Sequence, residues 1–439
     1  MKFFKKIIEY ILYLFVFFLP WQSRFIFKTA FIKGKYFEYG TYSIYFTDIL
    51  LMLLFLFSLF VFSKMLFSFS EEKLLFKIKK PFLLSLAFFD FFIFLSCFLA
   101  EDRFLAFYKY LWFLSGIFLF FLLSFFPYQR IKLFFFFLGG VFFESFLAIY
   151  QFLFQSSFAF KYFGLSRHIA GEPGSSVIET LNRERWLRAY GGLSHPNILG
   201  GFLVLAILIL VLYKKDIFYK NNFISFFIFN LLLSLFSLAL IFSFSRGAYL
   251  ALLFSLFLML IISFVKKEKL MQINILKSGF IIFIIFINIF LFYPSLFKTR
   301  MAFSTRLELK SKNERVEGYK DVFKIIKDNL WFGVGMGNYT LALKNELLNK
   351  EVYFYQPVHN VFLLILAEIG LFGFISFLVF LFSFFYFLSF KNVYVWSLFL
   401  ALIILFNLDH YFFSLHFGIL LFFTILGILT RREYVFKNT

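Results

Sequence analysis

The chain has 439 residues, of which 62% are hydrophobic and 84 are phenylalanine. Soluble globular proteins contain about 45–50% apolar residues, and apolar runs of about 18 or more residues indicate membrane spans, so the composition excludes a soluble protein and favours a polytopic membrane protein. The formal net charge of +20 does not indicate nucleic-acid binding, because many lysines and arginines lie in short connectors between apolar runs, where positive charge holds a loop on the cytoplasmic side.

The apolar runs predict an all-α polytopic membrane protein, a single integral membrane domain over residues 1–439 with about twelve transmembrane helices. The expected spans lie near residues 5–20, 46–67, 81–100, 104–126, 131–154, 195–213, 223–244, 247–265, 278–293, 358–388, 393–411 and 414–430. The first run begins like a signal peptide, but no small-residue cleavage site follows it, so an uncleaved first span is expected.

The charges of the short connectors predict the orientation of the chain in the membrane. With the N-terminus inside, the cytoplasmic connectors contain many lysines, whereas the short external connectors contain little besides Arg103 and Arg246. Both termini are therefore expected on the cytoplasmic side. Two long segments then lie outside, residues 155–194 and residues 294–357.

The larger external segment contains an amphipathic stretch from Glu314 to Leu330, in which apolar residues recur at helical spacing. Such a helix is expected to lie along the bilayer surface or to cover a cavity between spans. The glycine-rich stretch 333–337 follows. No strand precedes it and no Gly-Lys-Ser follows it, so a nucleotide loop is not indicated, and a tight turn or a backbone anion site is expected instead.

A histidine stands where this segment meets the next apolar run. His359 is followed at once by Asn360 and a long apolar stretch. An imidazole side chain titrates near neutral pH, which suits a catalytic proton acceptor. The structural alternative is that His359 or Asn360 only caps the free N–H groups of the helix.

Two arginines are expected to reach the same membrane face as His359. Arg246 lies in a very short turn whose small neighbours leave room for a bulky anion, and its five guanidinium donors suit phosphate oxygens. The alternative is an arginine that only reaches water from the bilayer edge. Arg315, in the first turn of the amphipathic stretch, resembles an ordinary solvated charge, but its place on a covering helix makes it a candidate for closing over a donor.

His195 and Arg188 are further candidates for substrate binding. His195 lies between Ser194 and Pro196, a pattern that indicates a helix start and favours capping. Arg188, just upstream, adds positive charge to the same region.

The sequence predicts no metal site. The remaining histidines lack ligand-like spacing, and the one cysteine lies within an apolar run. Glu101 and Asp102 could hold a divalent metal near a phosphate, but an ion pair with the adjacent Arg103 is an equal alternative.

Three acids fall within expected spans, where a charge costs at least about 2.5 kcal/mol on insertion scales. They are Asp90, Glu144 and Glu368. Each is expected to face the bundle interior with a partner, for which Lys109 is one candidate.

These pieces together resemble the O-antigen ligase and polymerase family of bacterial membrane glycosyltransferases. The matching motifs are Arg188-Ala189-Tyr190-Gly191, His195-Pro196-Asn197, Ser245-Arg246-Gly247, Arg315, the stretch 329–337, His359-Asn360 and Glu368-Ile369-Gly370. They cover roughly residues 186–380. The order of the motifs, and the long loop between Arg246 and His359, make the set fairly specific.

The resemblance implies a GT-C-like architecture and a transferase of the bacterial inner membrane with its active site on the periplasmic side. The donor would be a glycan on undecaprenyl pyrophosphate, with Arg246 and Arg315 holding the pyrophosphate. His359 would act as base on an acceptor hydroxyl of lipid A–core or of a growing glycan. Such a reaction is metal-independent and inverting, and no cofactor is required because the donor supplies the energy.

Three activities of the family remain alternatives: ligation to lipid A–core, polymerisation of repeat units, and transfer to a protein hydroxyl. The ligase is favoured because the long loop and the spacing from Arg246 to His359 resemble ligases. A competing class is a transporter of lipid-linked glycan. Transporters typically place their charged residues at the bilayer midplane between internal repeats, and the sequence shows no repeat.

Overall fold

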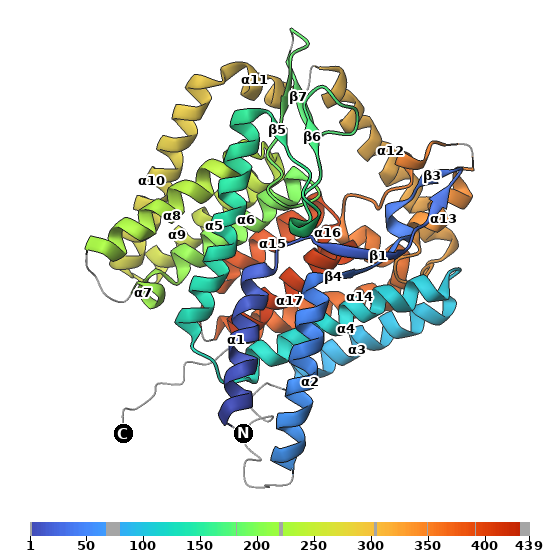
Figure 1. Cartoon of the computed structure of the whole chain (residues 1–439), viewed down its shortest axis with the longest axis horizontal. Coiled ribbons are helices and arrows are strands. Elements are labelled where there is room, and N and C mark those ends of the chain that lie inside the picture. Colours follow the sequence, from blue (N-terminus) through green and yellow to red (C-terminus); the bar gives the residue numbers. More distant parts are fainter. Residues whose placement is uncertain are drawn as a thin grey trace.

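The computed structural model describes residues 2–66, 80–180, 182–218, 223–302, 305–348, 350–390 and 392–430. The protein is predominantly α-helical, as expected (Figure 1). The helices are α1 Lys2–Phe18, α2 Phe46–Leu66, α3 Lys80–Leu99, α4 Arg103–Phe125, α5 Arg130–Phe154, α6 Pro196–Leu212, α7 Lys214–Ile217, α8 Phe223–Phe242, α9 Arg246–Val265, α10 Lys269–Phe292, α11 Pro294–Ala302, α12 Arg306–Asp328, α13 Tyr339–Glu346, α14 Val361–Ser389, α15 Val395–Leu408, α16 Tyr411–Ser414 and α17 His416–Thr430.

Each of the twelve expected spans coincides with a helix. Among the described residues, seven helices are long and apolar enough to cross a membrane, which confirms a polytopic membrane protein. The other five expected spans correspond to α1, α2, α6, α15 and α17. The full number of twelve crossings stays a prediction.

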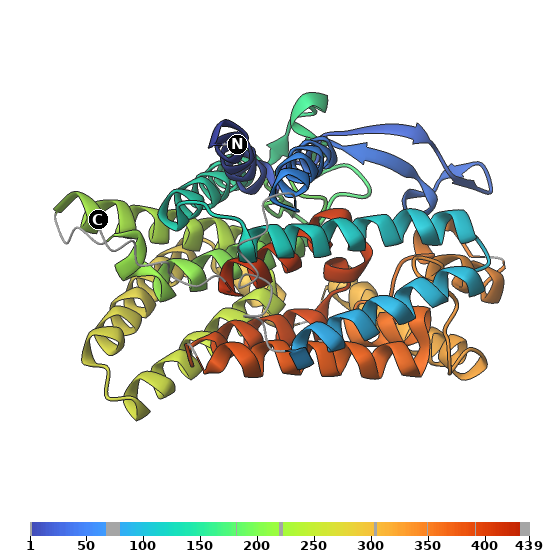
Figure 2. The same cartoon turned by 90° about the horizontal axis from the view of Figure 1, so that it is seen from below.

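The depth of each helix in the bundle follows from its sequence. Almost every residue of α6 and α17 is buried, as expected for helices that are apolar on all sides and lie at the centre. By contrast, only 11% of the apolar window of α10 is buried, so this helix presents most of its surface to lipid at the edge of the bundle. Figure 2 shows α14 packed along α3 and α17 packed along α4.

Short antiparallel strands occupy the connections at one end of the bundle. In the segment between α1 and α2, β1 Arg24–Lys28 pairs with β4 Tyr42–Tyr45, and β2 Phe31–Ile32 pairs with β3 Lys35–Tyr36. In the segment between α5 and α6, β5 Ser156–Ser157 pairs with β6 His168–Ile169, and β7 Val177–Glu179 pairs with β8 Arg185–Leu187. The 3-10 helices are η1 Glu38–Gly40, η3 Lys161–Phe163 and η4 Val352–Phe354.

Two of the acids inside the bundle fasten glycine turns. Gly192 N donates to Glu144 Oε2 at 2.6 Å. The adjacent Gly191 has φ +62°, and a Cβ at that position would lie 2.4 Å from the same oxygen, so only glycine fits there. The turn before α6 is thereby held against α5.

The second glycine turn lies against a break in α14. Gly337 N donates to Glu368 Oε2 at 2.8 Å, and Tyr339 N donates to Oε1 at 3.4 Å. The expected backbone anion site therefore binds a carboxylate of the same chain. Gly370, at φ 74°, interrupts α14 where the chain 331–332 crosses it, because a Cβ there would meet Trp331 O at 2.3 Å.

The expected partner Lys109 interacts with Glu368 electrostatically, whereas the direct hydrogen-bond donors to this carboxylate are backbone N–H groups. Lys109 Nζ lies 3.7 Å from the centroid of the Trp112 ring, a cation–π contact. Asp90 accepts a hydrogen bond from Tyr110 Oη at 3.1 Å. In a low-dielectric bundle a buried acid needs hydrogen-bond donors, which here are backbone N–H groups and a tyrosine hydroxyl.

Candidate functional site

The segments that connect the helices at one end of the bundle enclose a cavity of about 1370 Å³. All five residues predicted for the site line it: Arg188, His195, Arg246, Arg315 and His359. Arg188 and His195 precede α6, Arg246 begins α9, Arg315 lies in α12, and His359 precedes Asn360 at the start of α14. Residues up to 171 positions apart in the sequence therefore share one cavity, while their individual roles stay predictions.

His359 is free of the capping role, because Asn360 performs it. Asn360 Oδ1 accepts a hydrogen bond from Leu363 N at 3.0 Å. The His359 side chain is 32% exposed, and its Nδ1 lies 3.6 Å from Asp409 Oδ1. Within the described residues, this buried nitrogen has no hydrogen-bond partner. The distance is too long for a hydrogen bond as it stands, but such contacts often tighten when substrate binds.

Asp409 follows α15 and is held in place from two sides. Its Oδ2 accepts a hydrogen bond from Asn197 Nδ2 at 3.1 Å, and its Oδ1 accepts one from His410 N at 2.8 Å. Burial alone would raise the pKa of Asp409, but the neighbouring histidines, above all His359, hold it well below its usual range. An ionised carboxylate beside an imidazole orients the ring and stabilises its protonated form, which is what a general base needs.

Arg188 is buried and donates hydrogen bonds to three segments of the chain, near residues 176, 197 and 243. Its Nη2 donates to Asn197 Oδ1 at 2.8 Å, its Nε to Ser243 O at 2.9 Å and its Nη1 to Ser176 Oγ at 2.9 Å. Through Asn197 it connects to Asp409. These contacts stabilise the wall of the cavity. A role of Arg188 in substrate binding stays a prediction.

Arg246 is the first residue of α9 and shares a carboxylate with a second arginine. Its Nη1 lies 3.1 Å from Glu308 Oε2 and donates to Arg300 O at 2.7 Å. Arg300 Nη1 pairs with the other oxygen of Glu308, and its Nη2 donates to Phe244 O at 2.9 Å. Glu308 is only 4% exposed, so one buried carboxylate lies between two guanidinium groups.

The sequence-based description of Arg315 was wrong in one respect. Helix α12 begins at Arg306, not near residue 314, so Arg315 lies in the third turn and not the first. The N-terminal half of this helix is too polar to show the apolar spacing on which the prediction rested. Arg315 is half-buried and lies close enough to Arg246 and His410 to interact electrostatically with both.

His195, rather than Ser194, is the N-cap of α6. Its Nδ1 accepts a hydrogen bond from Asn197 N at 3.1 Å, which supports the capping interpretation. Burial, with the nearby positive charge of Arg188, lowers the pKa of His195 to about 3. The ring is therefore neutral at neutral pH. Its Nδ1 is already used as an acceptor, so only Nε2 can serve a substrate.

Potential metal ligands occur together at one place within the described ranges. One ligand atom each from His359, Asp409 and His410 lies within 4.8 Å of the others, although the spacing of the histidines in the sequence gave no sign of it. His410 Nδ1 is 2.6 Å from Ser414 Oγ, and Asp409 Oδ2 is bonded to Asn197. These hydrogen bonds leave His410 Nε2 and His359 Nδ1 near Asp409 Oδ1, at 3.9 Å and 3.6 Å from it. Such outer hydrogen bonds orient metal ligands as well as carboxylate–imidazole pairs, so the arrangement suits either use and a chelator distinguishes them.

Glu101 and Asp102 lie outside this cavity and have structural partners. Asp102 caps α4 by accepting a hydrogen bond from Leu105 N at 2.9 Å. Glu101 Oε2 accepts one from Asn345 Nδ2 at 2.8 Å. The two acids therefore link α3, α4 and α13 and do not face one another as a metal site.

Sequence reasoning missed Asp409, Arg300 and Glu308. Asp409 was placed within the expected span 393–411, whereas α15 ends at Leu408. The polar stretch 407–410 was the available signal, because it interrupts an otherwise apolar run. No local sequence pattern marks Arg300 and Glu308, because they meet only when α11 and α12 pack against one another.

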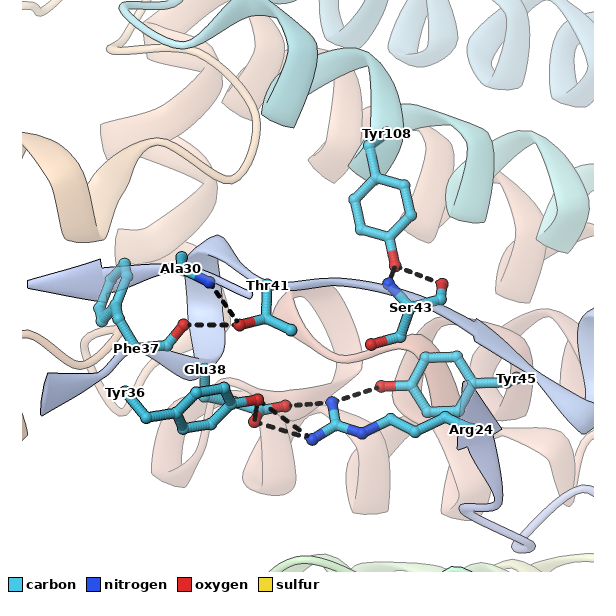
Figure 3. Close-up of polar contacts among 9 residues, drawn as sticks. All are labelled: Arg24, Ala30, Tyr36, Phe37, Glu38, Thr41, Ser43, Tyr45 and Tyr108. Carbon is cyan, nitrogen blue, oxygen red and sulfur yellow. Dashed lines mark hydrogen bonds and ion pairs between the residues drawn. The ribbon is translucent and has the colours of Figure 1, made fainter. Parts of the chain in front are cut away.

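A further wall of the cavity comes from residues 20–45, which we call the N-terminal β segment. The Arg24 guanidinium makes two hydrogen bonds to Glu38, at 2.5 Å to Oε1 and 2.9 Å to Oε2 (Figure 3). The hydroxyl of Tyr108 from α4 lies 2.8 Å from Ser43 N and donates to Ser43 O at 2.6 Å, which fixes the segment to the bundle. Sequence analysis did not recognise this segment as part of the site.

The comparison with known families covers part of the residues at the cavity. Residues 229–378 match the family model Wzy_C, described as O-Antigen ligase. The matched range includes Arg246, Arg315 and His359, while Arg188 precedes it and Asp409 follows it. No curated protein matches the chain.

Proposed function

On the premise of this O-antigen ligase domain, which supports the assignment of the chain to that family, we propose that the protein transfers a glycan from undecaprenyl pyrophosphate to a hydroxyl acceptor. The domain by itself supports a glycosyltransferase-like role. The observation that carries the finer proposal is the shared cavity, in which a histidine paired with a carboxylate faces several arginines. We place this cavity on the periplasmic side of the bacterial inner membrane, with lipid A–core as the acceptor.

In the proposed reaction, the acceptor hydroxyl attacks the anomeric carbon of the donor glycan. A new carbon–oxygen bond forms as the bond from that carbon to the pyrophosphate oxygen breaks, and the anomeric configuration inverts. The proton of the hydroxyl passes to His359, most simply to Nε2, because Nδ1 faces Asp409. The bonding electron pair leaves with the pyrophosphate oxygen.

The arginines would supply the main electrostatic stabilisation. Charge grows on the pyrophosphate as the bond breaks, and fixed cations in a site that excludes water stabilise it without a metal. Arg246 and Arg315 are the proposed ligands, and the partly exposed Arg300 adds a third cation beside them. When the donor binds, the ion pairs of Glu308 with Arg246 and Arg300 must then weaken or break.

A direct test uses the full chain in membranes, with purified lipid-linked glycan and lipid A–core. The substitution His359→Ala is expected to lower the rate of transfer by about 10²–10⁴-fold, the usual contribution of a general base. Binding of the donor should be nearly unchanged. His168→Ala is a matched control, because this histidine also lines the cavity but stacks on Tyr190 with ring centroids 4.0 Å apart.

Product analysis separates the alternatives within the family. Longer glycan chains without any core adduct would show a polymerase and exclude the ligase. Full transfer by His359→Ala would exclude His359 as base. Incubation with EDTA is expected to leave the rate unchanged; a loss that a divalent ion restores would instead assign a metal to the cluster of His359, Asp409 and His410.

A further inference from the structure

The cavity has two walls of different character. The wall formed by the start of α9, by α11, by α12 and by the turn before α6 is strongly cationic, with six basic residues against Glu308 and Glu314. The basic residues are Arg188, Arg246, Arg300, Lys310, Lys312 and Arg315. The second wall is formed by side chains of the N-terminal β segment, namely Gln22, Arg24, Glu38, Tyr39 and Tyr45. Its only two charges, Arg24 and Glu38, neutralise one another through their paired hydrogen bonds.

Four polar side chains of the N-terminal β segment hold one another in place without a ligand. Arg24 is held by Glu38, and the hydroxyls of Tyr36 and Tyr45 each lie 3.5 Å from its guanidinium nitrogens (Figure 3). The far end of the segment is anchored as well, because Lys33 Nζ donates to Leu348 O at 2.7 Å. A rigid polar surface loses little conformational entropy when it binds a partner.

Tyr39 brings this surface next to the reacting centre. Its ring centroid lies 6.3 Å from that of His410, which in turn lies 5.2 Å from that of His359. The ring is half-buried. Its hydroxyl makes no hydrogen bond to any residue in the described part of the chain, although the side chain lines the cavity.

Resting on the proposed function, we propose that Tyr39, with Glu38 and Arg24, forms the binding subsite for the sugar that carries the acceptor hydroxyl. An aromatic face, a carboxylate, a guanidinium and an amide together suit a neutral ring with many hydroxyls, because each hydroxyl both donates and accepts. A pyrophosphate gains nothing from a wall of zero net charge and is drawn to the arginines. An acceptor sugar on Tyr39 would stand beside His359, where its hydroxyl must lose a proton.

The test measures the acceptor and the donor separately, with the full chain in nanodiscs. Lipid A–core is the acceptor in one arm and lipid-linked glycan in the other, and undecaprenyl pyrophosphate is the probe for donor binding. Tyr39→Ala is expected to raise the apparent KM for the acceptor about tenfold, which corresponds to about 1.4 kcal/mol. Tyr39→Phe, which keeps the ring, should raise it about threefold, the effect of one hydrogen bond. The Kd for undecaprenyl pyrophosphate should stay within about twofold in both variants, since the proposed subsite bears no net charge.

Phe31→Ala is the matched control, because Phe31 belongs to the same segment, is 61% exposed and does not line the cavity. An unchanged KM for the acceptor in Tyr39→Phe and Tyr39→Ala would overturn the proposal. So would a rise of the donor Kd equal to the rise of the acceptor KM, since the segment would then bind the donor. If the wild-type chain transfers to neither acceptor, the proposed function itself fails; transfer with an unaltered KM defeats the subsite alone.

Discussion

The buried carboxylates of this protein fall into two regions with different partners. Glu144 and Glu368, inside the bundle, accept hydrogen bonds from the backbone of glycine turns. Glu308 and Asp409, at the cavity, face arginine and histidine side chains. All four are less than 9% exposed, so burial does not distinguish them.

The difference lies in what the partner can do. A backbone N–H is a fixed donor that neither titrates nor leaves, so it can only fasten a turn. An imidazole can change its charge state, and a guanidinium can exchange one anion for another. The comparison therefore predicts that Glu308 and Asp409 take part in the chemistry, whereas Glu144 and Glu368 stabilise the fold.

The sharpest test of this distinction is Asp409→Asn. An amide keeps one oxygen for Asn197 Nδ2 but removes the charge that stabilises a protonated His359. We expect kcat to fall by about 10²-fold or more while the donor Kd stays unchanged. Steady-state kinetics with saturating donor measure the effect.

Asp48→Asn is the control for the loss of a carboxylate beside a histidine. Asp48 Oδ1 lies 2.6 Å from His416 Nε2, a pair of the same kind that does not include His359. Its kcat should stay within a few-fold of wild type. Equal losses in the two variants would contradict a special role for Asp409.

Glu308→Gln should separate stability from donor binding. Only the carboxylate of this group is buried, and the two arginines are partly exposed. Loss of the carboxylate should therefore destabilise the fold by less than about 3 kcal/mol, the cost for a fully buried pair, and the unfolding temperature should fall. Without the charge of Glu308, the donor no longer competes for Arg246 and Arg300. The Kd for the donor should therefore decrease about tenfold, which is a small part of the Coulomb energy between two unit charges at contact distance. Thermal unfolding and titration with undecaprenyl pyrophosphate measure the two changes.

Glu314→Gln provides the comparison on the same helix. Glu314 pairs with Lys310 at 3.7 Å, and both side chains are about half exposed, so little change is expected in either measurement. A weaker donor affinity in Glu308→Gln would contradict competition and show instead that the carboxylate positions the arginines for the donor.

The sequence was sufficient for the helices and for part of the site. Apolar runs locate the spans because a span must be apolar along its whole length. Polar residues next to those runs pointed to His359, Arg246 and Arg188, which line one cavity, while their roles stay predictions. The capping role of His195 also follows from the adjacent proline.

The roles of Glu308 and of the N-terminal β segment at the cavity could not be predicted, because they depend on tertiary contacts that no local sequence pattern encodes. Glu308 matters because α11 and α12 fold back on the start of α9. The strands of the N-terminal β segment are only two to five residues long, too short for a clear alternation of polar and apolar residues. Its place at the cavity follows from contacts such as Tyr108 with Ser43, between residues 65 positions apart.

The backbone-partnered acids should tolerate amides much better than Asp409 does. Glu144→Gln keeps the oxygen that accepts from Gly192 N, so both activity and stability should change little. Glu368→Gln replaces one of two accepting oxygens and should cost about 1 kcal/mol of stability, with activity within a few-fold of wild type. A loss of kcat as large as that of Asp409→Asn, without loss of folded protein, would break the comparison.

The smallest effect is expected for His195→Asn, which tests whether this residue acts as a cap or as a substrate ligand. Asparagine is a good N-cap, so stability at neutral pH and donor affinity should stay close to wild type, whereas His195→Ala should cost about 1 kcal/mol. Because the pKa of His195 is lowered from 6.5 to about 3 in the folded state, the unfolded chain binds the proton more readily. The wild-type protein should therefore lose stability as the pH falls below about 6.5, and His195→Asn should lose less of it. Unfolding temperatures of both proteins at pH 7.5 and pH 5.5 measure this difference, and a tenfold weaker donor affinity in His195→Asn would instead assign the ring to the substrate.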